Sequence, residues 1–247
     1  MDSVRWLARG MHDVPEPDDW LSPRESERLA PLRFPKRRME SRLARWTAKH
    51  AVACALGLDA GLVTLASIEI ERASSGAPVV YVAGNPAPVA VSMTDRADWA
   101  VCAVAGRGMG VGTDLELVEF RTEAFVRDWF TPAERDRVLG AAPGQWRDLL
   151  ANLVWSAKES ALKVLETGLR RDTRSVEVDV IETNGEQRWA RLAVRSEEGV
   201  MFPGWWHRYG DFLLTVVADV DSFPPTTMDE PPRLTSAVPS HSWLPKQ

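Results

Sequence analysis

Residues 152–163 decide the fold, and they are Asn-Leu-Val-Trp-Ser-Ala-Lys-Glu-Ser-Ala-Leu-Lys. At roughly 100° per residue, this stretch forms a helix with two distinct faces. Glu159 and Lys163 lie one turn apart on the polar face, with Asn152 and Ser156. The apolar stripe consists of Leu150, Leu153, Val154, Ala157, Ala161, Val164 and Leu165. Taken alone, the polar face is typical of a solvated surface with one weak ion pair.

A second stretch, residues 109–118, predicts a β-strand with the sequence Met-Gly-Val-Gly-Thr-Asp-Leu-Glu-Leu-Val. Side chains alternate along a strand, so Gly112, Asp114 and Glu116 share one face. Val111, Thr113, Leu115 and Leu117 share the other face. Gly112 lacks a side chain where a bulky ligand would approach. The alternative interpretation is an exposed edge strand that carries ordinary surface acids.

Packing this strand against the polar face of the helix would bring Asp114, Glu116 and Glu159 together, with Lys163 beside them. Carboxylates that close repel one another unless a cation lies between them. Mg²⁺ is commonly bound by one or two carboxylates together with substrate phosphate oxygens. The two stretches together therefore predict a magnesium site that accepts a diphosphate.

The motif pair resembles the signature of the 4′-phosphopantetheinyl transferases, in their two-lobed, surfactin-synthetase-activating type. The residues that carry the resemblance are Gly-Thr-Asp-Leu-Glu at 112–116 and Trp-Ser-Ala-Lys-Glu-Ser-Ala-Leu-Lys at 155–163. Phe-Thr-Pro-Ala-Glu at 130–134 resembles the segment between the two motifs in that family. The resemblance extends over residues 20–220.

The resemblance implies an α+β fold, a pseudo-dimer of two similar lobes that each pack a small antiparallel sheet with a long helix. We expect an N-terminal lobe at residues 1–106, a C-terminal lobe with the metal motifs at 107–221, and the site in the cleft between them. A weak internal repeat agrees, because residues 55–70 and 167–178 share the order helix, glycine, aspartate, strand. The Pro- and Ser-rich tail, residues 222–247, is expected to be loosely attached.

The resemblance also implies a reaction. The 4′-phosphopantetheine group of coenzyme A would pass to a serine of an acyl- or peptidyl-carrier protein, as in secondary metabolite biosynthesis. Asp114, Glu116 and Glu159 would bind Mg²⁺, and Lys163 would neutralise developing charge. Glu159, or a water that it orients, would take the serine proton. No histidine lies in either motif, so histidine base catalysis is not expected.

A basic run opens the long helix predicted at residues 37–56, which ends at Gly57. Such a run is typical of a solvated face, or it binds phosphate groups. By position, Arg38, Arg45 and Lys49 are candidates for the 3′-phosphate of coenzyme A. Arg28 and Ser41 are further candidates, and Thr94 fits a hydroxyl position of the family.

The nucleotide end departs from the family pattern in three places. Asp95 stands where a histidine is expected, Ala77 where many relatives have lysine, and Ala44 where they have glycine. A carboxylate at position 95 would repel a phosphate unless Arg96 or another cation compensates. Two hypotheses remain: an active transferase with altered donor contacts, and a transferase-like protein repurposed as a non-catalytic binder or as an enzyme on another metabolite.

Composition and charge limit the classes of partner that we expect the protein to bind. The net charge of −5 gives no general case for nucleic acid, and no apolar run reaches the length of a membrane span. We expect a cytoplasmic monomer without a signal segment, with Cys54 and Cys102 as buried thiols. An acidic carrier protein would dock on cationic surface, for which the candidates are Arg121, Arg127, Arg135 and Arg137. The alternative is a mixed surface of interspersed acids and bases.

The remaining elements follow from apolar periodicity and turn residues. Residues 1–21 are expected to be irregular, and Ser22 caps a helix that begins at Pro23. Two further helices are predicted at residues 122–129 and 132–139. The expected strands are residues 66–70, 79–82, 89–93, 99–104, 175–181, 189–194, 202–207 and 212–217.

Overall fold

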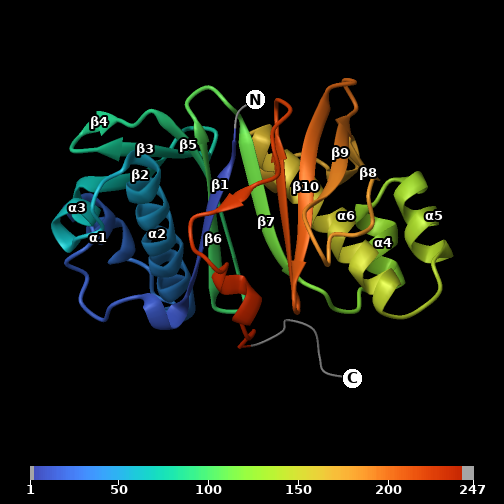
Figure 1. Cartoon of the computed structure of the whole chain (residues 1–247), viewed down its shortest axis with the longest axis horizontal. Helices are drawn as coiled ribbons and strands as arrows, with labels where there is room; N and C mark the ends of the chain where they lie inside the picture. The colour runs from blue at the N-terminus through green and yellow to red at the C-terminus, as the bar shows by residue number, and fades with distance from the viewer. Residues whose placement is uncertain (1–2, 241–247) are drawn as a thin grey trace.

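Two long helices, α2 (Pro35–Leu56) and α6 (Gln145–Val164), organise the two halves of the computed structural model, which describes residues 3–240. In Figure 1 the halves lie side by side, with α2 at the left and α6 at the right. Each helix packs against a mainly antiparallel sheet, so the predicted α+β class is confirmed. Below, the N-terminal half means residues 3–106 and the C-terminal half means residues 107–221.

The N-terminal half contains two sheets. Their strand orders are β12-β1-β6-β5 and β2-β3-β4. The helices of this half are α1 (Pro23–Leu29), α2 and α3 (Leu62–Ser67). The strands are β1 (Arg5–Gly10), β2 (Ile68–Arg72), β3 (Pro78–Val82), β4 (Asn85–Pro86), β5 (Val89–Arg96) and β6 (Trp99–Gly106).

The C-terminal half contains one five-stranded antiparallel sheet with the order β7-β11-β10-β9-β8. Helix α6 lies against β7 and β11, and α4 (Glu123–Trp129) and α5 (Pro132–Gly140) cover its outer side (Figure 1). The strands are β7 (Val111–Leu117), β8 (Val176–Val180), β9 (Ala190–Ser196), β10 (Met201–Tyr209) and β11 (Phe212–Ala218).

The predicted helix ends agree with the structure. The Ser22 hydroxyl accepts the Glu25 amide, the Glu25 carboxylate accepts the Ser22 amide, and Pro23 opens α1. Helix α2 ends at Gly57 with φ of 67°, a left-handed conformation that glycine adopts without a steric penalty. These local signals were readable because each depends on only a few consecutive residues.

A buried lysine–glutamate pair braces the N-terminal half. The Lys49 ammonium lies 2.5 Å from Glu25 and donates to the carbonyls of Trp20 and Leu65 at 3.0 and 2.9 Å. The other Glu25 oxygen accepts the amide of Ile70 at 3.1 Å. One ion pair therefore ties α1, α2, α3 and β2 together.

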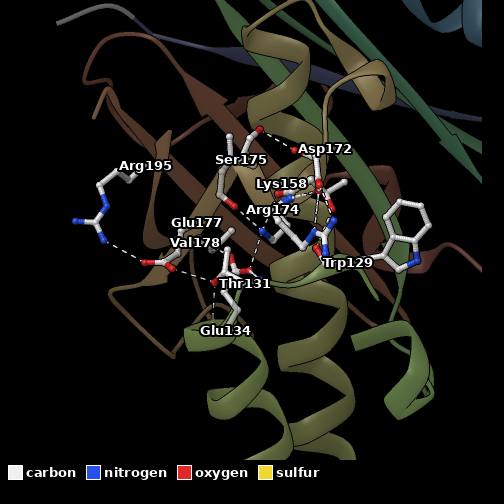
Figure 2. Close-up of polar contacts among 12 residues, drawn as sticks. Trp129, Thr131, Glu134, Lys158, Asp172, Arg174, Ser175, Glu177, Val178 and Arg195 are labelled. Atoms are coloured by element: carbon white, nitrogen blue, oxygen red, sulfur yellow. Dashed lines mark hydrogen bonds and ion pairs between the residues drawn. The ribbon is translucent and has the colours of Figure 1, made fainter. Parts of the chain in front are cut away.

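The C-terminal half repeats this arrangement (Figure 2). The Lys158 ammonium lies 2.7 Å from Glu134 and donates to the carbonyls of Thr173 and Val176. Glu134 accepts the amide of Val178 at 2.7 Å, as Glu25 accepts that of Ile70. Both glutamates stand third after a capping Ser or Thr and are the last residue of a Pro-x-Glu start. The repeat supports the predicted pseudo-dimer, which stays a prediction.

The halves meet where β5 approaches β7. The hydroxyls of Ser92 and Thr94 accept the backbone amides of Thr113 and Leu115 at 3.0 and 3.2 Å. Strand β7 is the edge of its sheet, so these amides have no neighbouring strand to bond with on that side. Two side chains of the N-terminal half thus complete the backbone hydrogen bonding of the predicted metal strand.

Two predictions about the chain ends were wrong. Residues 1–21 include strand β1, and residues 222–240 are docked, because β12 (Thr226–Thr227) pairs in parallel with β1. Arg9 and Asp229 add an ion pair of 2.7 Å. The C-terminal segment crosses between the halves in Figure 1 and ends in the short helix η4 (Arg233–Ser236). The rest of the predicted tail, residues 241–247, lies outside the described residues.

Strand β1 escaped prediction because its apolar side chains do not alternate with polar ones: Trp6, Leu7 and Ala8 are all buried. One side packs on α2 and the other fills the space between the halves. Within residues 3–240, no helix has both the length and the apolar character that crossing a bilayer requires.

Candidate functional site

Strand β7 lies against the polar face of α6, as predicted. Asn152 and Ser156 on that face are fully buried, and the Ser156 hydroxyl donates to the Asp114 carbonyl at 3.3 Å. The expectation for Gly112 was wrong. A Cβ there would come within 1.9 Å of the Ser160 carbonyl oxygen, so the missing side chain admits the helix backbone and not a ligand.

Asp114 has one engaged oxygen and one open oxygen. Its Oδ1 accepts the Thr94 hydroxyl at 3.1 Å and the Lys163 ammonium at 3.0 Å. Lys163 also donates to the carbonyl of Thr113 at 2.7 Å. The Oδ2 atom is buried and has no hydrogen-bond partner. A buried carboxylate oxygen without a partner is costly, and a bound cation would satisfy it.

Glu116 is held from several directions. Its Oε1 accepts the Trp155 indole N–H at 3.0 Å. Its Oε2 lies 3.1 Å from the Arg121 guanidinium and 3.3 Å from that of Arg96. Burial and the neighbouring Asp114 raise the pKa of Glu116, and the two arginines oppose that shift.

Glu159 faces the same group of charges. Burial, Asp114 and Glu116 together raise its pKa to about 8, against the opposing charges of Lys163 and Arg121. Burial would lower the pKa of Lys163, but Asp114 and Glu159 outweigh burial and raise it. Lys163 therefore stays charged near neutral pH, while Glu159 holds a proton that a cation would displace.

The structure thus gathers Asp114, Glu116, Glu159 and Lys163, from two separate segments, in one electrostatic cluster. Within residues 3–240, no three His, Cys, Asp or Glu side chains already converge as a preformed metal cage. The open Oδ2 of Asp114 and the raised pKa of Glu159 nevertheless fit a divalent cation. The residues present are therefore suited to Mg²⁺, whose preferred ligands are carboxylate oxygens.

The predicted nucleotide end lies along α2. Arg38 is half exposed and lies 3.4 Å from Asp18. Arg45 is more enclosed and lies 3.7 Å from Glu25. The buried Nε of Arg45 has no hydrogen-bond partner. Arg38 and Arg45 therefore keep the capacity to bind an anion, and their role stays a prediction.

Further arginines surround Arg45. Burial lowers the pKa of Arg45, and the charges of Arg72 and Arg28 lower it further, while Glu25 opposes them. The Ser41 hydroxyl accepts a hydrogen bond from Arg45. Clustered arginines repel one another and would be relieved by an anion such as phosphate. Sequence reasoning named Arg28 and Ser41 as candidates but missed Arg72, which is the last residue of β2 and lies far from the basic run in the sequence.

The prediction that Lys49 binds phosphate was wrong. Its side chain is fully buried, and its ammonium is engaged by Glu25, Trp20 and Leu65 as described above. A phosphate in the crevice has no access to it. Arg45 and Lys49 are one helical turn apart, which suggested that they bind the same phosphate. In the structure Arg45 donates to Ser41, whereas Lys49 donates to the backbone carbonyls of Trp20 and Leu65.

Thr94 is placed at the site but serves another purpose than predicted. Its hydroxyl gives its proton to Asp114 and accepts the amide of Leu115. It therefore positions the acidic strand, and the proposed contact with coenzyme A has no free donor.

Asp95 lies at the same crevice, open to solvent yet enclosed by protein. This enclosure, together with the charges of Glu40 and Asp114, raises its pKa to about 6. Lys163 and Lys36 oppose the rise. Charged residues of α2 and of the acidic cluster therefore both act on the Asp95 carboxyl.

The candidate carrier-docking arginines are paired with acids. Arg127 lies 2.7 Å from Glu123, Arg135 lies 3.2 Å from Asp136, and Arg137 is near Asp179. Arg121 instead belongs to the acidic cluster. This is the mixed surface of the alternative interpretation.

One cavity lies elsewhere in the fold. It has a volume of about 690 Å³ and lies between β10, β1 and the C-terminal segment, with Trp6, Trp189, His207 and Tyr209 among its lining residues. None of the predicted site residues lines it. The opposing charges and the open carboxylate oxygen lie instead at the acidic cluster.

Both cysteines are free thiols. Cys102 is buried as expected, but Cys54 is exposed and accepts a hydrogen bond from Arg5.

Comparison with known proteins agrees with this placement. Residues 110–215 match the model of the 4′-phosphopantetheinyl transferase superfamily. This superfamily segment contains β7 and α6, and with them both acidic motifs. This match bears out the predicted resemblance to the superfamily, and the surfactin-synthetase-activating type stays a prediction.

One relative is the L-aminoadipate-semialdehyde dehydrogenase-phosphopantetheinyl transferase of Eremothecium gossypii. It is 30% identical to this chain over 156 residues, which are 60% of this chain and 55% of the relative. The chain therefore spans about half the length of that transferase.

Proposed function

We propose that this chain transfers the 4′-phosphopantetheine group of coenzyme A to a serine of an acyl- or peptidyl-carrier protein, with Mg²⁺. The observation that carries the proposal is the open, buried oxygen of Asp114, together with Glu159, whose pKa is raised by burial and by the charges of Asp114 and Glu116. Both residues lie in the superfamily segment.

The reaction joins the serine oxygen to the β-phosphorus of coenzyme A. The bond from that phosphorus to the bridging oxygen breaks, and 3′,5′-ADP leaves with the electron pair. The serine proton must pass to a base. Phosphoryl transfer of this kind depends mostly on positioning and charge neutralisation.

Glu159 is the proposed base, directly or through a water. Displacement of its proton by the cation would leave Glu159 as a carboxylate, which can accept the serine proton. Lys163 stays charged, and its proposed role is to offset negative charge that develops on the departing phosphate.

Mg²⁺, when bound, would neutralise the diphosphate. Asp114 and Glu159 supply the open carboxylate oxygens for it. The predicted third ligand, Glu116, belongs to the same cluster but is engaged by other groups.

The donor's 3′-phosphate is proposed to lie against Arg45, with Arg28, Arg72 and Arg38 nearby. The support is the mutual repulsion of these arginines and the unpartnered Nε of Arg45. The carrier protein, a monomeric state and a cytoplasmic location are proposed with the reaction. Free thiols agree with a reducing compartment.

A second candidate is a transferase-like protein repurposed as a binder or as an enzyme on another metabolite. The observation that favours it is Asp95, a carboxylate at the crevice beside Glu40. It would repel a phosphorylated nucleotide that approached it.

A mass measurement separates the two candidates. The full chain is incubated with an apo-carrier protein, coenzyme A and Mg²⁺, and the carrier is weighed by mass spectrometry. A gain equal to one phosphopantetheine group supports the transferase. No gain at high enzyme concentration, with several carriers, supports repurposing.

A further inference from the structure

The cavity between β10, β1 and the C-terminal segment lies on the other side of the C-terminal sheet from α6. Tyr209 in its wall shares a buried cluster with Trp6 of β1, whereas Trp206 of the same strand packs with α6. In Figure 1 the C-terminal segment crosses one side of this sheet and α6 covers the other. The volume of about 690 Å³ lies within the range of about 300–1,000 Å³ that is common for small-molecule sites.

Four aromatic rings from three separate segments line this space, which we call the aromatic cavity. They are Trp6 on β1, Trp189 just before β9, and His207 and Tyr209 on β10. The Trp6 ring centre lies 6.3 Å from that of Trp189 and 5.5 Å from that of Tyr209. His207 stacks on Tyr209 at 4.1 Å. Walls made of ring faces and edges favour a flat ligand.

Backbone hydrogen bonding fixes these walls in place. Trp6 pairs with Ala103 of β6 on one side and with Thr227 of β12 on the other. The loop before Trp189 is held to β10, because the Arg208 amide donates to the Gly185 carbonyl at 2.8 Å. A ligand would therefore enter a site that is already formed, which reduces the entropy cost of binding.

Two polar atoms of the rings are left without partners. The Trp6 side chain is 1% exposed, and its buried indole N–H has no hydrogen-bond partner, which is costly. The His207 Nδ1 donates to the Arg208 carbonyl at 2.9 Å, and burial lowers the pKa of this ring, so His207 is neutral near pH 7. Its Nε2 is then a hydrogen-bond acceptor, and none of residues 3–240 donates to it.

The charged groups of the lining do not call for a charged ligand. Arg208 lies 2.6 Å from Glu186. Arg188 lies 3.8 Å from Glu182. Both guanidinium groups are thus paired, and Glu230 is exposed to water. An anion would compete with the paired glutamates, and the charge of Glu230 is already solvated.

We propose that the aromatic cavity is a second binding site, for an uncharged planar heteroaromatic molecule with a hydrogen-bond acceptor and an N–H donor on its edge. The acceptor would satisfy the Trp6 N–H, the donor would satisfy His207 Nε2, and the ring would lie between the aromatic walls. Such a ligand would contact β1, β10 and the C-terminal segment at once. This inference does not rest on the proposed transfer reaction.

The test is binding of three flat, three-ring fluorescent probes to the full chain, measured by fluorescence anisotropy. Lumichrome is uncharged with carbonyl and N–H groups, proflavine is a cation, and anthracene-2-sulfonate is an anion. We expect lumichrome to bind at least about tenfold more tightly than either charged probe. It should also raise the midpoint of thermal unfolding, because it binds the folded state. No binding of lumichrome, or tighter binding of a charged probe, would overturn the proposal.

Two variants locate the probe. Trp6→Phe removes the indole N–H and keeps a ring, and His207→Phe removes the Nε2 acceptor and keeps a ring on Tyr209. Each should weaken lumichrome binding about fivefold to tenfold. Trp20→Phe is the matched control, because the Trp20 indole N–H is also buried and unpartnered but does not line the cavity. Its affinity for lumichrome should equal that of wild type.

Circular dichroism verifies that all three variants are folded. Unchanged affinity in both Trp6→Phe and His207→Phe would place the probe elsewhere and overturn the site. An equal loss in Trp20→Phe would show that the losses reflect general destabilisation, which would also overturn it.

Discussion

Helices α2 and α6 carry the same buried lysine but different residues beside it. Lys49 is followed by His50, and Lys158 by Glu159; the tryptophans Trp46 and Trp155 precede the lysines at equal spacing. Both lysines are fully buried against a glutamate. The buried lysine–glutamate pair is therefore repeated in both halves, whereas the residue after the lysine differs, His50 in one half and Glu159 in the other.

The surroundings of that next residue differ in charge. Burial and the charge of Arg9 together lower the pKa of His50 to about 4, while Asp13 and Asp229 oppose the shift. Glu159 instead has its pKa raised to about 8 among carboxylates. The comparison shows that the buried lysine–glutamate pairs fix both helices in place. Among residues 3–240, the cluster of Asp114, Glu116 and Glu159 lies in the C-terminal half.

The largest effect is expected from Glu159→Gln. Loss of the proposed base and metal ligand should reduce transfer by about a thousandfold or more while the fold is kept. His50→Gln is the matched variant at the corresponding place on α2 and should leave the rate nearly unchanged. Initial rates of carrier mass gain measure both, and an unchanged rate in Glu159→Gln would reject its role.

The braces should make similar contributions to the free energy of unfolding. Lys49→Met and Lys158→Met each leave a buried glutamate without its cation, which should cost about 3–5 kcal/mol. Urea unfolding measures the loss. Adding Glu25→Gln or Glu134→Gln to the respective variant should restore part of it. A small effect in one half alone would show that the two braces are not equivalent.

Gly112→Ala tests the close approach of α6 to β7. A methyl group there meets the Ser160 carbonyl, so the strand and helix must separate, at about 1–3 kcal/mol of unfolding free energy. Gly106→Ala, where nothing lies within 4 Å of the added carbon, is the control and should be nearly neutral. Transfer should fall in the first variant only, because the shift also moves Asp114 away from Lys163.

The smallest effect expected is the acid sensitivity due to His50. Its pKa is about 4 in the folded protein and about 6.5 when unfolded, so below pH 6.5 the unfolded state takes up the proton first. Stability present above pH 6.5 is therefore lost as the pH falls towards 4, by roughly 1–3 kcal/mol after allowing for partial exposure. His50→Gln should flatten this part of the pH–stability curve, and a curve of unchanged slope would contradict the assignment.

Local signals in the sequence predicted most elements of the fold. The caps at Ser22 and Gly57 and the alternation along residues 111–117 each involve neighbouring residues only. Strand β1 and the docked segment at 222–240 depend on partners far away in the chain, so no local pattern revealed them. The motif spacing predicted which acids would meet, since it fixes both faces that come into contact.

The sequence did not predict which side chains would pair in the folded protein. Lys49 and Arg45 share a helical face, but only the packed structure shows that Lys49 turns into the core towards Glu25. Arg96 and Arg121 carried no motif, and their place on Glu116 depends on β5 and β7 lying together. A signal was available for the braces: the repeated Ser/Thr-Pro-x-Glu start followed by a lysine at the same interval.

Thr94 gives the N-terminal half a part in chemistry whose proposed catalytic groups all lie in the other half. One hydroxyl from β5 holds both the Leu115 amide and the Asp114 carboxylate. A fragment cut out at the interhalf boundary would lose that tether and expose the edge of β7. The acidic strand would then be free to fray or to pair with another chain. The two halves therefore depend on each other to keep β7 in place.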